Sequence, residues 1–433
     1  MSTTLPQPGA AQTVLPEALI PSAVRVRLLA TLFVGQSLFS ASQIMTFAAL
    51  PILAVELAGN DALAGVPATV TLLGRAAAAY PIGWLMDRYG RRAGLSTGFL
   101  LAMGGFLLSA LAAEWASLLG FLLGALMAGM GRGIGELARY AAAEVELPDR
   151  RAKAIGFVVF AGTVGAVVGP RLLVPAEQLA QRFGWISPTG PFVVGAGLAY
   201  LAFMLNALLL RPDPMRVGQM IAVHGRPATA PAAGPGRAVR EIFSDWTVRL
   251  ALVAMVIGQL VMTVIMVITP LYMSRHDYDT DAIAWVFMGH TLGMFGLASV
   301  TGWLIDRVGQ VPMIIAGGLI LALSAVLTPL AGNVPLLAAA LFLLGLGWNF
   351  CYIAGSAMLA GALQPEERGR VQGASETLVS LASGLGSIST GAIFAQGGIT
   401  GISAAGLACS VALLLITVWI ARFRVRPLAA GGA

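Results

Sequence analysis

The chain has 433 residues, of which 58% are apolar and 11% are charged, and its mean hydropathy is +0.84. Soluble domains carry roughly a quarter charged residues, so this composition excludes an ordinary water-soluble domain. The net charge of +6 does not indicate a nucleic-acid-binding protein, because the arginines lie in short segments between apolar stretches instead of on one basic face.

Apolar stretches of full membrane-spanning length recur along the chain. About twenty apolar residues cross about 30 Å of hydrocarbon as a helix, whereas barrel strands need only about ten alternating residues. The sequence therefore predicts an all-α membrane protein with twelve transmembrane helices, at 28–56, 62–86, 93–113, 116–140, 155–174, 190–210, 247–271, 281–305, 311–331, 335–361, 370–394 and 400–421.

The stretches fall into two sets of six. The expected domains are an N-terminal tail, a first six-helix bundle, a linker, a second six-helix bundle and a C-terminal tail, at 1–27, 28–210, 211–246, 247–421 and 422–433. The linker is rich in Pro, Gly and Ala between Arg211 and Arg240, which predicts a poorly ordered tether. The tail lacks the basic start and short apolar core of a secretory signal.

Basic residues predict the orientation, because Lys and Arg in short loops resist translocation. They concentrate in the even-numbered loops and the tails, whereas the opposite side has only Arg182 and Arg275. We therefore expect a multi-pass membrane protein with both termini in the cytoplasm. Cys351 and Cys409 lie within spans and are expected to be packing residues.

The two halves contain related motifs. GWLMDRYG at 83–90 recurs as GWLIDRVG at 302–309, an offset of 219, and PDR at 148–150 recurs as PEER at 365–368, an offset of 217. Repeated bundles related by an axis along the membrane normal are a common plan among transporters, with the substrate site between the halves near the midplane.

The segment GWLMDRYGRR at 83–92 resembles the signature loop between helices 2 and 3 of the major facilitator superfamily of secondary transporters. The resemblance implies two pseudo-symmetric six-helix bundles and a conformational latch made by Gly83, Asp87, Arg88, Gly90, Arg91 and Arg92, with Asp306 and Arg307 in the second copy. Asp87 can face the N-terminus of helix 11, and Arg91 and Arg92 can pair with acids on helix 4. The alternative is that these arginines only set the orientation. Gln310 replaces Arg91 in the second copy, so that latch should be weaker.

On helix 5, GAVVGP at 165–170 resembles the core of a motif found in proton-coupled exporters of that family. Arg171 follows where the family pattern would bring further glycine. The alternative interpretation is a close helix contact through small residues, with no bearing on the direction of transport.

Charged side chains inside spans usually face a partner or a water-filled cavity. Arg75 lies about 18 Å from Asp87 along helix 2, and it could contact substrate, take part in coupling or form a structural ion pair. Arg132, Glu136 and Arg139 share one face of helix 4; Arg132 and Glu136 are candidates for proton coupling, with a non-titrating latch pair as the alternative for Glu136.

Two further charged or titratable candidates lie in the second half. His290, near the middle of helix 8, could titrate near neutral pH or be a hydrogen-bonded core residue. Glu376 falls two turns into helix 11, and we expect it to join the latch.

Polar and aromatic residues at helical spacing complete the candidate substrate site. They are Gln36, Ser40 and Gln43 on helix 1, Gln259 and Thr263 on helix 7, and Trp348, Asn349 and Tyr352 on helix 10. The helix 10 group would form an aromatic wall for a ring-containing solute, although tight packing between helices would produce the same pattern.

These features predict a secondary transporter that moves a small organic solute by alternating access, with proton-coupled export of a drug-like or metabolite molecule preferred. The alternatives are proton-coupled uptake of an organic anion and a transport-dead sensor or scaffold. No P-loop, dinucleotide fingerprint, metal-spaced cluster or nucleophile elbow occurs, so we expect no enzyme activity, no cofactor and no metal. The expected partners are the lipid bilayer, the solute and protons, and the protein should be a monomer.

Overall fold

The computed structural model describes residues 20–59, 63, 66–224, 237–276, 278 and 280–423. The regular structure in these ranges is helical throughout, which confirms the expected fold class. The first half contains α1 (Ser22–Ala58), α2 (Val66–Tyr89), α3 (Arg91–Glu114), α4 (Leu118–Gly135), α5 (Ala138–Val145), η3 (Pro148–Arg150), α6 (Arg151–Arg182), α7 (Thr189–Leu209) and α8 (Pro214–His224). The second half contains α9 (Val239–Ile242), α10 (Trp246–Arg275), α11 (Thr280–Thr291), η4 (Leu292–Gly296), α12 (Ala298–Val308), α13 (Gln310–Leu327), η5 (Thr328–Leu330), α14 (Val334–Ala362) and α15 (Arg368–Phe423).

Nine helical segments of the described chain are long and apolar enough to cross a membrane. These nine segments correspond to nine of the twelve expected spans. The other three correspond to α2, to the broken helix α11–η4–α12 and to the second half of α15. The last two spans appear as one element because helix continues on both sides of Gly398, whose φ of 58° and ψ of −152° are not helical. Glycine tolerates this conformation because it has no Cβ.

The linker differs from the expected tether in one part. Residues 214–224 form the helix α8, whereas residues 225–236 lie outside the described residues. α8 is held at its start by Asp213, whose carboxylate accepts hydrogen bonds from the backbone N–H groups of Arg91 and Arg92 at 3.0 and 2.9 Å. A tertiary contact with the start of α3 thus orders a segment whose composition favours disorder.

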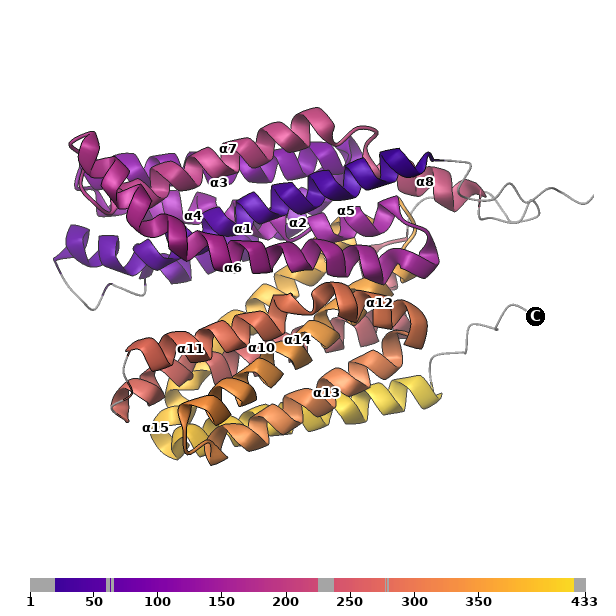
Figure 1. Ribbon diagram of the computed structural model, residues 1–433. Coiled ribbons are helices and arrows are strands. Elements are labelled where there is room, and N and C mark those ends of the chain that lie inside the picture. The colour runs from indigo at the N-terminus through magenta and orange to yellow at the C-terminus, as the bar shows by residue number, and fades with distance from the viewer. Residues whose placement is uncertain are drawn as a thin grey trace, which may run out of the picture.

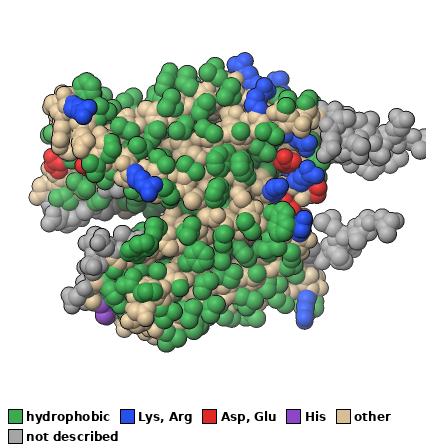
Figure 2. All heavy atoms as spheres, viewed as in Figure 1, with side chains coloured by type: hydrophobic (Ala, Val, Ile, Leu, Met, Phe, Trp, Pro, Cys, Tyr) green, Lys and Arg blue, Asp and Glu red, His purple; other side chains and the backbone are tan. Residues whose placement is uncertain are grey.

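The two halves lie side by side with their helices running in the same general direction (Figure 1). We call the end that carries α8 and the turns after α2 and α12 the basic end. Lys and Arg side chains gather there, and at the opposite end the space-filling view shows a notch between the halves (Figure 2). The halves therefore meet mainly at the basic end.

Glycines allow this close contact. A Cβ on Gly83 of α2 would lie 2.1 Å from the carbonyl oxygen of Gly369 on α15, and a Cβ on Gly302 of α12 would lie 2.3 Å from that of Ala152 on α6. Each approach is too tight for any side chain. The two contacts occupy equivalent places in the internal repeat, so α2–α15 and α12–α6 form a pair of matched seams.

Candidate functional site

Five charged side chains from both halves meet near the middle of the spans. They come from α2, α4, α5 and α15 and are Arg75, Arg132, Glu136, Arg139 and Glu376. We call this group the central cluster. The spacing of the helix 4 residues predicted that they share a face. The structure shows that Glu376 of α15, in the second half, contacts this group.

Glu136 lies between two arginines. Its Oε2 accepts a hydrogen bond from Arg75 Nη2 at 2.5 Å, and its Oε1 lies 3.6 Å from Arg132 Nε. Arg75 Nη2 also lies 3.9 Å from Glu376 Oε2. One guanidinium of the first half thus contacts a carboxylate from each half.

Arg139 ties the halves together more tightly. It pairs with Glu376, and its Nε donates to Ser356 Oγ of α14 at 3.0 Å. Its guanidinium carbon lies 4.3 Å from the ring centre of Tyr140 and 4.2 Å from that of Tyr352, which are cation–π distances. Arg139 is therefore held by two bundles at once.

Two side chains of the central cluster are partly exposed. The side chain of Arg132 is 37% exposed and that of Glu136 is 20% exposed, although both lie near the middle of the fourth span, whereas Glu376 is only 1% exposed. An exposed arginine at this depth requires a water-accessible cavity. Water or a solute can therefore reach Arg132 and Glu136.

The central cluster has a surplus of positive charge. Arg75, Arg132 and Arg139 bring three cations, and Glu136 and Glu376 bring at most two anions. Arg75 Nε is buried and has no hydrogen-bond partner among the described residues. The site can accept one further negative group.

Aromatic and amide groups of the second half lie next to the cluster. The Trp348 and Tyr352 rings stack at 4.4 Å with an interplanar angle of 19°. Trp348 Nε1 donates to Gln259 Oε1 at 2.9 Å, and the Gln259 and Thr263 side chains reach Ser383 on α15, at 3.4 and 3.2 Å. Two of the three residues expected to form an aromatic wall on helix 10 thus stack on each other, and Arg139 packs on the same Tyr352 ring.

Asn349 and His290 lie elsewhere. Asn349 Nδ2 donates to the carbonyl oxygen of Met294, and His290 Nδ1 lies 3.1 Å from the carbonyl oxygen of Leu341. Both residues are buried between helices of the second half. In the described structure, neither residue shares a hydrogen bond or ion pair with the central cluster.

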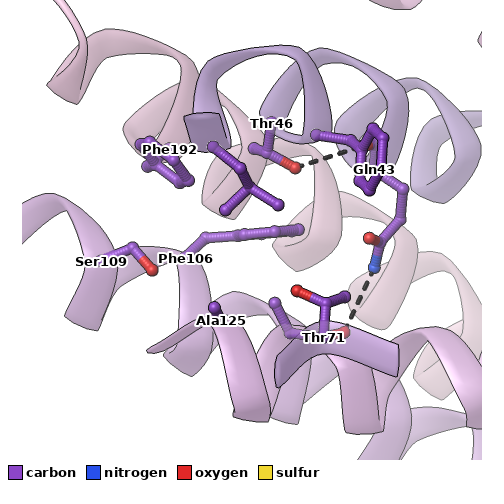
Figure 3. Close-up of a pocket in the computed structure, with 10 residues that line it drawn as sticks. Gln43, Thr46, Thr71, Phe106, Ser109, Ala125 and Phe192 are labelled. Carbon is purple, nitrogen blue, oxygen red and sulfur yellow. Dashed lines mark hydrogen bonds between the residues drawn. The ribbon is translucent and has the colours of Figure 1, made fainter. Parts of the chain in front are cut away.

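The helix 1 candidates are divided between two places. Gln36 Oε1 is buried and has no hydrogen-bond partner in the part of the chain that the structure describes, and Ser40 packs against Gly165 of α6. Gln43 Nε2 donates to the carbonyl oxygen of Ala128 at 3.4 Å and lines a small pocket inside the first bundle, together with Thr71 and Ser109 (Figure 3). Gln43 therefore belongs to the interior of one bundle.

At the basic end, Asp87 makes the contact expected from the sequence. Its carboxylate accepts hydrogen bonds from the backbone N–H groups of Gly369 and Arg370 at 2.6 and 2.8 Å. An acid at a helix N-terminus is stabilised by unpaired N–H groups and by the helix dipole. Glu376, which the sequence placed in this latch, lies in the central cluster instead.

The three arginines of the 83–92 segment make different contacts. Arg91 is 1% exposed and donates to Glu144 of α5 through Nε and Nη2, at 2.9 and 2.6 Å. Arg88 lies over the rings of Trp84 and Tyr89 at about 5.8 Å and 5.7 Å. For Arg92 the described contacts are those of its backbone, so the expected pairing of its side chain with a helix 4 acid is not present. Gly90 has a φ of 94°, which favours glycine.

The second copy repeats the backbone contact without the arginine. Asp306 accepts hydrogen bonds from the N–H groups of Ala152 and Lys153, at 3.0 and 2.8 Å, at the start of α6. Arg307 stacks on Trp303 at 4.2 Å. Gln310 is uncharged, so it cannot supply the ion pair that Arg91 makes with Glu144 in the first copy.

The helix 5 motif packs within the first bundle. Cβ atoms on Gly165 and Gly169 would meet Ser40, Ala41 and Ile44 of α1, and α6 remains helical through Pro170. These contacts agree with the small-residue interpretation of the motif.

Sequence reasoning missed several partners. Glu144, Asp213 and Ser356 carry no motif, and their roles follow from contacts between segments 53 to 217 residues apart in sequence. The available signal was the position of Glu144, which lies on the same helical span as Glu136 and Arg139 and toward its basic end.

Two halves of six spanning helices with a charged cluster between them match the plan of the secondary transporters that the sequence resembles. The chain belongs to the Major Facilitator Superfamily, whose family model matches residues 32–296 and 251–432. Its members are transporters of small molecules and not enzymes, so this protein is a multi-pass membrane transporter.

Three known proteins illustrate the relationship. The uncharacterized MFS-type transporter YdeG of Bacillus subtilis is 33% identical over 85% of this chain and 86% of its own length. The riboflavin transporter RfnT of Brucella anthropi is 30% identical over 80% and 84%. The crystal structure of the human organic anion transporter MFSD10 (TETRAN) superposes with a TM-score of 0.73 at 16% identity and covers 91% of this chain and 99% of that one, which shows a shared fold.

Proposed function

We propose that this protein is a proton-coupled transporter of a ring-containing organic anion, working by alternating access in the bacterial cytoplasmic membrane. The observation that carries the proposal is the central cluster, in which two carboxylates from different halves share three arginines. Its surplus positive charge favours an anionic solute, and the stacked Trp348 and Tyr352 rings beside it favour a planar one.

Proton coupling is proposed from Glu136 and Glu376. Glu376 pairs with Arg139 and Arg75 across the boundary between the halves, so opening the basic end must separate these charges. Separating a buried ion pair costs about 3 to 5 kcal/mol. Protonation of the carboxylate removes that attraction. Glu136, which is accessible from the cavity, would exchange the proton with water.

The related riboflavin transporter supports the proposal that the substrate is planar, because riboflavin has a flat fused-ring system. Export is the direction we prefer, following the resemblance of the 165–170 segment to the exporter motif. Uptake of the same class of anion is the second candidate, because the contacts of Gly165 and Gly169 with α1 explain that segment without reference to direction. We further propose that the protein acts as a monomer with both termini in the cytoplasm.

The test uses purified protein in liposomes with an imposed pH gradient. A panel of ring-containing carboxylates and a panel of cationic dyes are offered to the wild type and to Glu136→Gln. We expect the wild type to accumulate carboxylates, and the variant to lose about tenfold or more of that accumulation while it still exchanges substrate for substrate, since exchange moves no net proton.

Arg182→Gln serves as the matched control, because this exposed arginine lies at the end of α6 away from the basic end. Equal accumulation by wild type and Glu136→Gln would overturn the coupling role. Transport of dyes with no carboxylate transport would overturn the anion assignment. The direction of the gradient that drives accumulation distinguishes export from uptake.

A further inference from the structure

A charged groove lies on the α6–α12 seam at the basic end, outside the central cluster. It has a volume of about 520 Å³ and is lined by Asp149, Arg150, Lys153, Trp303, Asp306 and Arg307. Asp149 and Arg150 lie in η3, and Lys153 lies in the first turn of α6. The other three residues lie at the end of α12. The groove therefore spans the two halves of the molecule.

Its cations are available for a ligand. Asp306 is already engaged by the backbone of Ala152 and Lys153. Arg150 Nε lies 3.8 Å from Asp149 Oδ2, and the side chains of Arg150 and Asp149 are 54% and 70% exposed. Across the described ranges, no carboxylate forms an ion pair with the side chains of Lys153 or Arg307. Three cations against two acids leave a positive surplus.

An indole forms the other part of the lining. Trp303 is 40% exposed, and the Arg307 guanidinium lies 4.2 Å from its ring centre. Exposed tryptophans beside basic residues occur at the headgroup level of membranes, where the ring is half in apolar surroundings and its N–H meets polar groups. The groove lies where a helix leaves the membrane, so a headgroup can reach it.

The internal repeat shows what occupies the equivalent place in the first copy. Glu367 there corresponds to Arg150 at the offset of 217, and Arg370 corresponds to Lys153. Arg237 of the linker covers that place: its Nε donates to Glu367 Oε1 at 3.0 Å, and its carbonyl oxygen accepts from Arg370 at 2.8 Å. A cation therefore covers an acid in the first copy. At the second copy the acid is replaced by Arg150, so a complementary occupant must be an anion.

We propose that this groove binds the phosphate of an anionic phospholipid headgroup, through Arg150, Lys153 and Arg307, with the Trp303 ring at headgroup depth. Soluble phosphate shares the charge chemistry but gains nothing from the indole or from the membrane surface. A phosphate held by side chains of both α6 and α12 would stabilise the closed seam. The lipid would then favour the conformation in which the basic end is shut.

The test is lipid binding measured by native mass spectrometry and by thermal unfolding of the purified full-length protein in detergent. The protein is titrated with phosphatidylglycerol, with phosphatidylcholine and with inorganic phosphate. The variant is Arg150→Gln combined with Lys153→Gln, and the control is Arg182→Gln at the other end of α6. Neither substituted side chain belongs to the central cluster.

We expect phosphatidylglycerol to bind the wild type and the control and to raise the unfolding temperature, with no comparable effect of phosphatidylcholine. In the double variant the affinity should fall by about fivefold for each removed charge. Undiminished binding of phosphatidylglycerol by the double variant would overturn the proposal. So would protection by inorganic phosphate that equals the effect of the lipid and depends on the same two residues, because the groove would then be a site for a soluble anion.

Discussion

Arg139 and Glu376 show how single residues join the two halves at mid-membrane. Arg139 places its guanidinium between the rings of Tyr140 and Tyr352 while it pairs with Glu376 and donates to Ser356. A planar, always charged group suits this position, because it can stack on rings and hydrogen-bond at its edges at once. In the proposed mechanism the pair stabilises the closed basic end and makes its opening depend on the charge of Glu376.

Glu367, in the turn before α15, provides a prediction about pH. Burial tends to raise its carboxyl pKa, but hydrogen bonds from Arg237 outweigh burial and hold the pKa of Glu367 below its usual range. The resulting stability is therefore present above the unfolded-state pKa, near 4.3, and is lost as the pH falls through the lower folded-state value. We expect Glu367→Gln to reduce stability by about 1 kcal/mol at pH 7, with the deficit shrinking as the pH is lowered toward 3.

The measurement is thermal unfolding of the protein in detergent across this pH range. Glu366→Gln is the matched control, because the neighbouring carboxylate is exposed and should change the unfolding temperature little at any pH. A deficit that stays constant from pH 7 to pH 3 would contradict the assigned charge interaction.

At the scale of elements, the α2–α15 seam depends on the absence of a side chain at Gly83. A Cβ there would lie 2.1 Å from the Gly369 carbonyl oxygen, and both partners are backbone, so the helices must move apart. We expect Gly83→Ala to reduce transport at least tenfold and to make the basic end more accessible. Accessibility is measured by the labelling rate of a cysteine introduced at Thr377, whose hydroxyl contacts α2, after Cys351 and Cys409 have been replaced by alanine.

Gly197→Ala is the control for that experiment, since nothing lies within 4 Å of a Cβ at this position on α7. Alanine favours helix over glycine, so this variant should transport normally and be equally or more stable. If Gly83→Ala showed wild-type labelling and transport, the seam would not be a closing contact.

The repeated motifs predicted the two seams better than they predicted the central cluster. The resemblance of GWLMDRYG to the family's signature loop placed Asp87 at the start of helix 11, where the helix dipole stabilises a carboxylate. No sequence motif predicted the contact between Glu376 and Arg139. That contact depends on how α15 is rotated about its own axis, and packing along the whole helix sets this rotation. The same reason explains why Gln43 proved to lie inside one bundle, beside the pocket in Figure 3.

At the scale of the whole molecule, the charge of the central cluster predicts an effect of membrane voltage. With both carboxylates ionised and a monoanion bound, the central cluster is neutral. In the proposed proton-coupled export the empty site returns with one carboxyl protonated, and it then carries two positive charges. Moving one charge through 100 mV changes the free energy by about 2.3 kcal/mol. We expect net anion flux to change about fivefold or more between 0 and −100 mV, because the empty carrier must return charged.

Substrate exchange should change less than twofold over the same range, because the loaded carrier is neutral. Both fluxes are measured in liposomes whose potential is set by a potassium gradient and an ionophore. Exchange that is as voltage-sensitive as net flux would show that the loaded site is not neutral.

The amino-acid sequence by itself determined the environment, the helical class and the repeat, since these follow from apolar length, from the cost of unpaired backbone groups in lipid and from motif spacing. It also identified the charged residues inside spans, which need a partner or a water-filled cavity. Only the tertiary structure decided how they pair: that Glu376 serves the central cluster, that His290 bonds to a backbone carbonyl, and that Arg237 covers one seam while Arg150 leaves the other open. The physical reason is that pairing depends on how helices from distant parts of the chain are rotated and seated against one another, and packing of the whole bundle sets that geometry.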